Sequence, residues 1–390
     1  MNFDWTEKNQ EIKSRVAGLF DRAGRTMAES LEHAELPELE RLTREYLSKL
    51  AEVGYLNVGI GPAAASQTME LMAGQEELAQ VSSSLFLATE TSARLFGGLV
   101  AGFGEAAQVH EILEPLSRGE LIGAVGVSEA EDAQDPSCFR TTAYQDGQEF
   151  VLSGRKSFVT NGPIADCLAI VGNIGEQPAV FLVEKGLPGL IMGPRLQTLG
   201  YNGLAVASIE LDNVHIPRSR VLGPFDDQTP LDFLRSVEDM VLAVGSIGLM
   251  QSLVAEARQY AGSNNRGGKA IFSYQEIRFK LAEMLTLTQT AQLLTYRAGW
   301  MAAEADPEAR TTLHCAKVFT AEASEKVASL AMQIMAGRGY VSGNMVGRCY
   351  REAKFAGIAG TTCEIARMSI AEDLLRQYPT HRRERGDRRD

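Results

Sequence analysis

Length, composition and charge exclude several classes of protein. At 390 residues the chain is long enough for two or three packed units, each with its own core. Its 45% hydrophobic and 23% charged residues are typical of a globular protein, and no uninterrupted apolar run approaches the roughly 20 residues of a membrane span. A formal net charge of −12 argues against nucleic acid or an anionic membrane as a partner, because both bind basic patches.

The first residues and the metal-ligating residue types narrow the location and the chemistry. The start, MNFDWTEKNQ, lacks the basic segment and apolar stretch that are typical of a secretory signal, so we expect a cytoplasmic protein. Five cysteines and five histidines are scattered without a CxxC pair or a metal-ligand spacing. The sequence therefore predicts no metal site, no disulfide framework and no Cys/His dyad.

Residues 1–118 have the periodicity of helices. Between residues 36 and 53, five apolar side chains fall on one stripe of a helix, namely Leu39, Leu42, Tyr46, Leu47 and Leu50. This first part of the chain is predicted to be a helical domain.

Residues 119–226 differ, because short β-branched runs alternate with turn residues. Asp146-Gly147 and Lys185-Gly186 are typical turn dipeptides. The pattern predicts a middle domain formed by a β-sheet or a small barrel.

Helical periodicity returns over residues 227–376. A helix is predicted to start at Thr229, with its hydroxyl as the cap and Pro230 in the first turn. The following run, residues 240–250, carries no charge, which predicts a helix buried on every side. We expect a bundle of four or five helices here, followed by a solvated tail over residues 377–390.

Six short motifs occur along the chain in an order that one family shares. They are Ser128-Glu129 with Asp135, residues 156–162, residues 211–217, residues 333–340, residues 350–353 and residues 360–367. Together they resemble the acyl-CoA dehydrogenase family over about residues 3–376. The resemblance implies an α+β multi-domain fold with an N-terminal helical domain, a middle β-domain and a C-terminal four-helix bundle. It also implies FAD as the cofactor and an acyl thioester as the substrate.

The resemblance assigns cofactor-binding roles. Ser128 and Thr160 would donate hydrogen bonds to the flavin edge, where negative charge accumulates as hydride arrives, and Phe158 would stack beside the ring. Ordinary turn chemistry at strand ends is the alternative for both hydroxyls. Further residues that the resemblance assigns to FAD are Arg266, Gln275, Gln333, Gly337, Thr362 and Glu364. Of these, Thr362 and Glu364 would hold the ADP half, whereas Gln333 and Gly337 would meet the FAD of a neighbouring subunit in a homodimer or homotetramer.

The catalytic base is the main departure from the common pattern. Most members supply a glutamate where this chain has Gly360, and a minority, including the isovaleryl-CoA dehydrogenases, carry it on the buried helix of the bundle, where this chain has Glu238. Counting in fours from Glu238 reaches Leu242 and Ser246, so its face is mostly apolar. Glu238 is therefore either a desolvated base or the last solvated residue before the buried run. Asp239 is a second candidate base, about 100° away around the helix.

Gly360 keeps a catalytic role in this interpretation, because the resemblance implies that its backbone N–H holds the thioester oxygen. The residues expected on the substrate side are Asp239, Tyr201, Gln134 and Ala359.

Several departures fall where phosphates or the acyl carrier would bind. The usual arginine and phenylalanine of one FAD contact are Asn264 and Gly267, and Arg266 is expected to substitute for the arginine. Gln134 replaces a serine, and residues 200–206 lack the usual polar pattern. A shortened loop near residue 60 is expected to reshape one wall of the acyl pocket. These changes leave open whether the acyl carrier is coenzyme A or a phosphopantetheinylated carrier protein.

The sequence thus predicts an FAD-dependent dehydrogenase that introduces an α,β double bond into a short, branched or cyclic acyl thioester. Glu238 would remove the α-proton, the β-hydride would go to flavin N5, and an electron-transfer flavoprotein or oxygen would accept the electrons. Two alternatives stay open: a flavin-dependent oxidase or monooxygenase on the same fold, and a flavin-poor subunit without catalysis.

Overall fold

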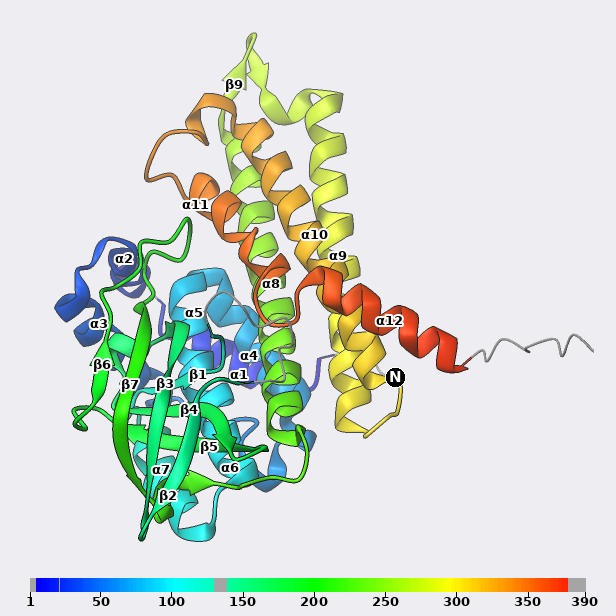
Figure 1. The fold of residues 1–390 in the computed structure, drawn as a ribbon. Helices are drawn as coiled ribbons and strands as arrows, with labels where there is room; N and C mark the ends of the chain where they lie inside the picture. Colours follow the sequence, from blue (N-terminus) through cyan, green and yellow to red (C-terminus); the bar gives the residue numbers. More distant parts are fainter. Residues whose placement is uncertain (1–4, 21, 130–138, 378–390) are drawn as a thin grey trace, which may run out of the picture.

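The chain forms a block of helices, a curled β-sheet and a second helical block, in that order (Figure 1). The computed structural model describes residues 5–20, 22–129 and 139–377. The first block contains α1 Glu7–Gly18, α2 Arg22–Ser30, α3 Leu36–Glu52, α4 Thr68–Val81, α5 Ser83–Glu90, α6 Gly98–Phe103 and α7 Ala106–Ser117. The long second block contains α8 Thr229–Ser263, α9 Gln275–Ala303, α10 Ala309–Met335, α11 Met345–Glu352 and α12 Cys363–Gln377. The predicted α+β fold with two helical domains around a β-domain is confirmed.

The apolar stripe predicted for the first block is buried as expected. In α3, the side chains of Leu39, Leu42, Tyr46, Leu47 and Leu50 are all buried. They belong to a core cluster that also takes in Val241 and Leu242 of α8. The first helical block therefore shares its core with α8, the central helix of the second block. This shared core holds α8 and the side chains on it in a fixed position.

Eight strands form the sheet in the order β6-β7-β3-β2-β4-β5-β8, with β1 beside β4. Their bounds are β1 Gly123–Gly126, β2 Thr142–Asp146, β3 Glu149–Thr160, β4 Cys167–Ile174, β5 Gln177–Glu184, β6 Leu190–Met192, β7 Val206–Pro217 and β8 Val221–Leu222. A two-residue turn at Gly147, whose φ is +61°, joins β2 to β3 as the sequence predicted. β1 and β2 run parallel to β4, and the other pairings in this sheet are antiparallel.

Strands β4 and β5 are buried on both faces. Ile170 and Phe181 point into the core enclosed by the sheet, whereas Val171 and Val180 pack with the side chains of Phe96 and neighbouring helical residues. Because alternate side chains of a strand point to opposite faces, two buried faces require a continuous apolar run, as the sequence has in both strands.

The start of α8 differs in one detail from the prediction. Thr229 is the first helical residue and Gln228 is the N-cap, whereas Asp227 Oδ1 accepts a hydrogen bond of 2.9 Å from the Thr229 N–H. Pro230 lies in the first turn, as expected. A capping side chain accepts from an N–H two or three residues later, as Asp227 does here for Thr229.

The uncharged run of α8 is buried between α4, α9 and α10. By length and composition this helix could cross a membrane, with a mean hydropathy of 1.6 over its most apolar window, but 61% of that window is buried inside the protein. Its apolar character is that of the central helix of a packed core.

One buried carboxylate joins α4 to the second block. Glu76 accepts hydrogen bonds from Gln292 Nε2 at 2.8 and 2.9 Å, from the Tyr296 hydroxyl at 2.8 Å, and from Gln251. Because these donors come from α8 and α9, the hydrogen bonds of Glu76 hold α4 against both helices.

Candidate active site

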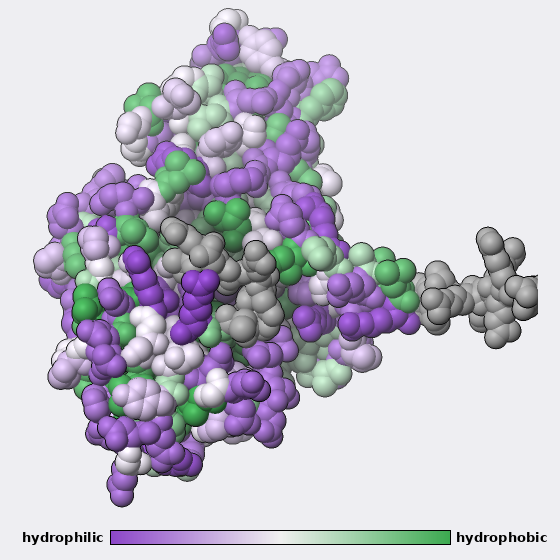
Figure 2. Space-filling model, in the orientation of Figure 1, coloured by the Kyte–Doolittle hydropathy of each residue, from purple (hydrophilic) through white to green (hydrophobic). Residues whose placement is uncertain are grey.

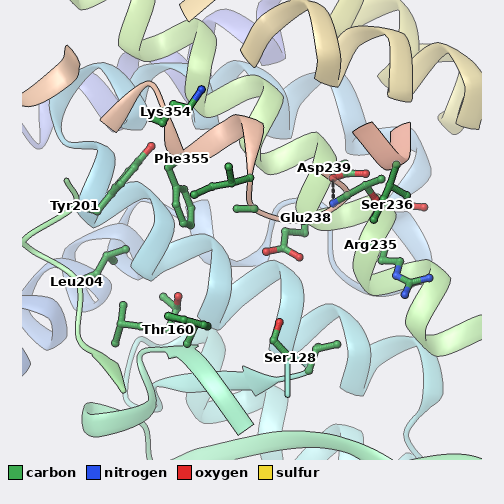
Figure 3. A pocket seen from close by; sticks show the side chains of 18 of the residues that line it. Ser128, Thr160, Tyr201, Leu204, Arg235, Ser236, Glu238, Asp239, Lys354 and Phe355 are labelled. Atoms are coloured by element: carbon green, nitrogen blue, oxygen red, sulfur yellow. Dashed lines mark hydrogen bonds between the residues drawn. The ribbon is translucent and has the colours of Figure 1, made fainter. Parts of the chain in front are cut away.

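A cavity of about 780 Å³ lies where the end of β3, the first half of α8 and the segment before α12 meet (Figure 3). Its walls come from Ser128, from Phe158 and Thr160, from residues 198–206, and from residues 351–361, with the N-terminal parts of α8 and α10. None of the described residues that line it belongs to the first helical block. The volume is in the range of small-molecule and cofactor sites.

A buried ion pair fixes the backbone around Ser128. Lys156 Nζ lies 2.7 Å from Glu129 Oε1 and donates to the Val127 carbonyl at 3.0 Å. Both side chains are almost fully buried, and burial lowers the pKa of Lys156 to about 8. Ser128 itself accepts at its carbonyl from the Ser157 N–H at 2.8 Å. No role was predicted for Lys156, because its partner Glu129 is 27 residues away and the strand around it carries other polar residues.

The end of β3 presents an aromatic ring to the cavity. Phe158 has a φ of +55°, its side chain is 72% exposed, and a register irregularity separates Lys156 from Val159. Asn161, with φ +63°, anchors the turn through its Nδ2, which donates to the Ala88 carbonyl at 2.8 Å. A bulky residue rarely adopts a left-handed backbone, and such strain concentrates at functional sites.

This arrangement fits a flavin. Two hydroxyls, those of Ser128 and Thr160, and one aromatic ring line the same side of the cavity, as the sequence predicted for the isoalloxazine edge. The exposed ring of Phe158 offers a planar surface to a planar cofactor. The turn-chemistry alternative explains neither the strained backbone nor the exposure of this ring.

The predicted ADP contacts lie beside the cavity rather than in it. Thr362 Oγ1 accepts from the Ile365 N–H at 3.3 Å, so it caps α12, and Glu364 is exposed in the first turn of that helix. Their neighbours Thr361 and Ile365 line the cavity. Both predicted residues are therefore near enough to an elongated cofactor to stay candidates.

Four other predicted cofactor residues are exposed and do not line the cavity of their own chain, namely Arg266, Gln275, Gln333 and Gly337. Arg266 belongs to the hairpin of β9 Asn265–Arg266 and β10 Lys269–Ala270, far from the cavity along α8 (Figure 1). Gly267 and Gly268, with φ +57° and +79°, form its two-residue turn, which explains a glycine where the family usually has phenylalanine. Contact with FAD from a neighbouring subunit stays a prediction.

Glu238 lies in the cavity, and its carboxylate points toward the side formed by Ser128 and Thr160 (Figure 3). Burial raises the pKa of this carboxyl to about 7, with a further contribution from Asp239, while Lys317 and Arg235 oppose the rise. Its residual exposure is toward the cavity. This geometry matches the desolvated base of the prediction rather than a solvated residue at the edge of a buried run.

Asp239, by contrast, is engaged inside the protein. Its side chain is 1% exposed. Its Oδ1 accepts hydrogen bonds from Lys317 Nζ at 3.0 Å and from the Thr361 N–H at 2.8 Å. Asp239 also lines the cavity, and its role as a second base or substrate contact stays a prediction. Lys317 was missed, and its signal was a single charge on the buried face of α10.

Gly360 lies where the backbone conformation and the neighbouring side chains leave no room for a Cβ atom. Its φ is +60°, and a Cβ added there would lie 2.6 Å from Asp239 Oδ1 and 3.4 Å from Glu238 Cγ. Side chains essentially never approach so closely, and the left-handed backbone disfavours them further. The usual glutamate is therefore excluded from position 360 by packing, and the carboxylate beside it comes from Glu238.

The remaining wall is apolar and aromatic. The Tyr201 ring packs against the Phe355 ring with centroids 5.1 Å apart, and Leu204 and Ala359 line the cavity near them. Tyr201 and Ala359 thus line the cavity and their contact with substrate stays a prediction, whereas Gln134 lies outside the described residues. The shortened loop near residue 60 does not line this cavity, and its predicted effect on the acyl wall stays a prediction. It instead folds on itself, with the Gly59 N–H donating to Gln67 Oε1 at 3.0 Å.

Comparison with known proteins agrees with this fold. Family profiles of the acyl-CoA dehydrogenase N-terminal, middle and C-terminal domains match residues 6–120, 124–214 and 236–375. The mitochondrial isovaleryl-CoA dehydrogenase of Oryza sativa subsp. japonica is 31% identical over 77% of this chain and 75% of its own length. The structure of butyryl-CoA dehydrogenase from Megasphaera elsdenii superposes with a TM-score of 0.88 at 24% identity, covering 96% of this chain and 100% of that one. A prolyl acyl carrier protein oxidase gives 0.82 at 23% identity, with coverage of 96% and 100%.

The chain belongs to the acyl-CoA dehydrogenase family. It is therefore an oxidoreductase of the class that acts on CH–CH bonds, and its cofactor is FAD.

Proposed function

We propose that this protein is a dehydrogenase that introduces an α,β double bond into a short, branched or cyclic acyl thioester, with Glu238 as the base. The observation that carries the proposal is the carboxyl of Glu238, partly buried at the cavity wall with a pKa raised to about 7. A carboxylate that is stable in both protonation states near neutral pH is suited to take a proton from a carbon acid.

The residues around Glu238 divide the reaction between them. Glu238 takes the α-proton and holds it on its carboxylate, while the N–H of Gly360, next to it, stabilises the negative charge that develops on the thioester oxygen. Apolar residues Leu204 and Phe355 exclude water from the acyl side of the cavity. When bound, FAD supplies the acceptor for the β-hydride at N5.

The size of the acyl group follows from the wall of the cavity. Tyr201, Leu204 and Phe355 close the space beside Glu238, and the helices of the first block contribute no lining residue among those described. Leu242, one turn beyond Glu238, is buried and does not line the cavity either. A long straight chain would need space there, so a compact acyl group is favoured.

The carrier of the acyl group is proposed to be either coenzyme A or the phosphopantetheinyl arm of a carrier protein. The fold is compatible with both, since similar structures include a butyryl-CoA dehydrogenase and a prolyl acyl carrier protein oxidase. Electrons would leave through an electron-transfer flavoprotein or to oxygen.

Bleaching of the flavin under anaerobic conditions tests the function and the carrier together. The FAD-loaded protein is mixed with butyryl-CoA, isovaleryl-CoA and a prolyl carrier protein, and the absorbance of oxidised flavin is followed. We expect rapid bleaching with one of the two compact CoA thioesters or with the carrier protein, and formation of the unsaturated thioester. Absence of bleaching by all three, together with oxygen-dependent hydroxylation of an added substrate, would favour the monooxygenase instead.

We also propose a homo-oligomer, because apolar residues are exposed in two regions. Phe279, Leu293 and Trp300 recur at multiples of seven along the outer stripe of α9. Further exposed apolar residues lie on α12, where hydrophobic atoms interrupt the mainly hydrophilic face of the molecule (Figure 2). Water-exposed apolar surface of this kind usually marks an interface.

Light scattering coupled to size exclusion should give a mass of two or four chains of 42.4 kDa. Leu293→Asp should lower that mass and weaken FAD retention, if Gln333 and Gly337 complete the cofactor site of a neighbour. Glu256→Gln, a change on α8 away from this stripe, serves as the control and should leave the mass unchanged. A wild-type mass of one chain would contradict the proposal.

A further inference from the structure

We infer that the buried ion pair of Asp239 and Lys317 is a positioning device, which holds the turn of residues 359–361 against Glu238 and confines the catalytic base to α8. The inference rests on the proposed function, because it concerns the same base and the same backbone N–H.

Lys317 uses all of its donors on this turn. Its ammonium group is fully buried and lies 3.0 Å from Asp239 Oδ1, 2.7 Å from the Ala359 carbonyl and 3.1 Å from the Thr361 carbonyl. An ammonium group has three protons, so no donor is left over. The two carbonyls belong to the residues on either side of Gly360, and one cation therefore fixes the backbone before and after it.

Asp239 fixes the same turn from the other side. Its Oδ1 accepts the Thr361 N–H at 2.8 Å, while the following residue of the turn, Thr362, caps α12. The peptide group that joins Gly360 to Thr361 is thus held by the carboxylate at its N–H. Because Asp239 and Glu238 are adjacent on α8, the same helix sets both the base and the turn that faces it.

Asp239 also excludes a side chain from the turn. Its Oδ1 would lie 2.6 Å from any Cβ at position 360, which is too close for a carbon atom. The carboxylate that anchors the turn and a glutamate at position 360 are therefore incompatible. The ion pair therefore requires glycine at position 360, and the base must come from another position, which is 238.

The energetics favour positioning over stability as the role of the pair. A buried ion pair adds little net stability compared with apolar residues of the same volume, because both charges lose their hydration. Apolar residues could fill this space, but they could not bind two carbonyls and an N–H at once. Charges acting on Glu238 are those of Asp239 and Arg235 from its own helix and of Lys317 from α10. His314 of α10, whose pKa is lowered by burial, also lines the cavity.

The test compares Asp239→Ala, Asp239→Asn and Lys317→Met in the FAD-loaded protein with Glu76→Gln as the matched control. Glu76 is equally buried and hydrogen-bonded but lies outside the cavity. The measurements are the flavin-reduction rate at saturating thioester, the thioester dissociation constant, the pH midpoint of the rate, and amide hydrogen exchange over residues 357–363. The thioester is whichever of butyryl-CoA, isovaleryl-CoA and prolyl carrier protein bleaches the wild type fastest.

We expect Asp239→Ala and Lys317→Met to slow flavin reduction about 10- to 100-fold, since a misplacement near 1 Å costs that much, with the dissociation constant within about threefold. Amide exchange in residues 357–363 should speed up in both. Asp239→Asn keeps an oxygen that can accept from the Thr361 N–H, so it should recover part of the rate. The pH midpoint should move down without the Asp239 charge and up without the Lys317 charge. Glu76→Gln should lower the melting temperature and change neither rate nor midpoint.

The pH midpoint of the rate should shift in opposite directions in the Asp239 and Lys317 variants. A general loss of stability cannot produce opposite shifts. If the variants keep the wild-type rate and exchange while Glu238→Gln is inactive, the inference is wrong and the proposed function stands. If they lose rate only in proportion to melting temperature, as the control does, the pair is structural and the inference is also wrong. Full activity of Glu238→Gln would instead remove the proposed function. Asp239→Asn is isosteric, so it keeps the test decisive where Asp239→Ala does not fold.

Discussion

Replacing Glu238 with glutamine is expected to slow thioester-dependent flavin reduction by about 10²- to 10⁴-fold or more, because a positioned general base is worth that much in a carbon-acid step. The amide keeps the size and the hydrogen-bonding shape of the carboxyl but cannot take a proton. FAD content, measured by absorbance, should be unchanged, since Glu238 faces the cavity and holds no backbone group. Stopped-flow absorbance under anaerobic conditions measures the rate.

Two comparisons make this result specific. Glu256→Gln changes a carboxyl on the same helix outside the cavity, and its rate should equal that of the wild type. Asp239→Asn should keep measurable activity, because Asp239 positions the turn and does not accept the proton. A Glu238→Gln protein that reduces flavin within tenfold of the wild type would show that the base is elsewhere.

The pH dependence of the same rate follows from the raised pKa of Glu238. Below a pH of about 7 the carboxyl is protonated and cannot act as a base, so the rate should rise through pH 7 and level off above it. The glutamine variant should lose this rise. Because the pKa in the folded protein exceeds the ordinary value of 4.5, the folded state binds more protons, and the contribution of this group to stability is lost as pH rises from about 4.5 past 7.

Moving the base to the position that most of the family uses is expected to fail. Gly360→Glu, alone or combined with Glu238→Gln, should leave flavin reduction at least about 10²-fold below the wild type, because the turn that presents the N–H of residue 360 must shift. Its Cβ would lie 2.6 Å from Asp239 Oδ1, in a backbone with φ +60°. A left-handed backbone alone costs a residue with a side chain about 1–2 kcal/mol.

Gly343→Ala separates this clash from the backbone strain. Gly343 has φ +84°, and a Cβ there would meet no atom within 4 Å, so the variant carries the strain without the collision. It should melt at a lower temperature and retain the wild-type rate. Recovery of flavin reduction in the Glu238→Gln, Gly360→Glu double variant would show that the turn can hold a base, and would contradict the packing argument.

The order of the domains could be predicted from the sequence because it depends on local patterns, and the same patterns gave a candidate for the base. The stripe of Leu39 and Leu42 in α3 and the uncharged run after Asp239 are periodicities of a few residues, which the chain carries whatever its tertiary contacts. Glu238 was assigned from the resemblance to the isovaleryl-CoA dehydrogenases, and the spacing of apolar residues after it supported that assignment.

The arrangement around that base could not be predicted in this way. Lys317 and Asp239 are 78 residues apart, and the turn they hold follows another 42 residues later. The orientation of Asp239, about 100° around the helix from Glu238, was expected, but its ion pair with Lys317 was not. The left-handed backbone of Phe158 and the hydrogen bond from Thr229 to Asp227 were likewise decided by contacts that no periodicity encodes.

By itself, the sequence determined which segments are helices and strands, the family to which they belong, and a carboxylate at the edge of a buried helix. Tertiary structure alone decided that this carboxylate faces a cavity, that a cation fixes the turn beside it, and that position 360 must be glycine. The physical reason is that secondary structure follows from hydrophobic spacing along the chain, whereas desolvation and ion pairing depend on which distant residues the fold brings within about 3 Å of each other.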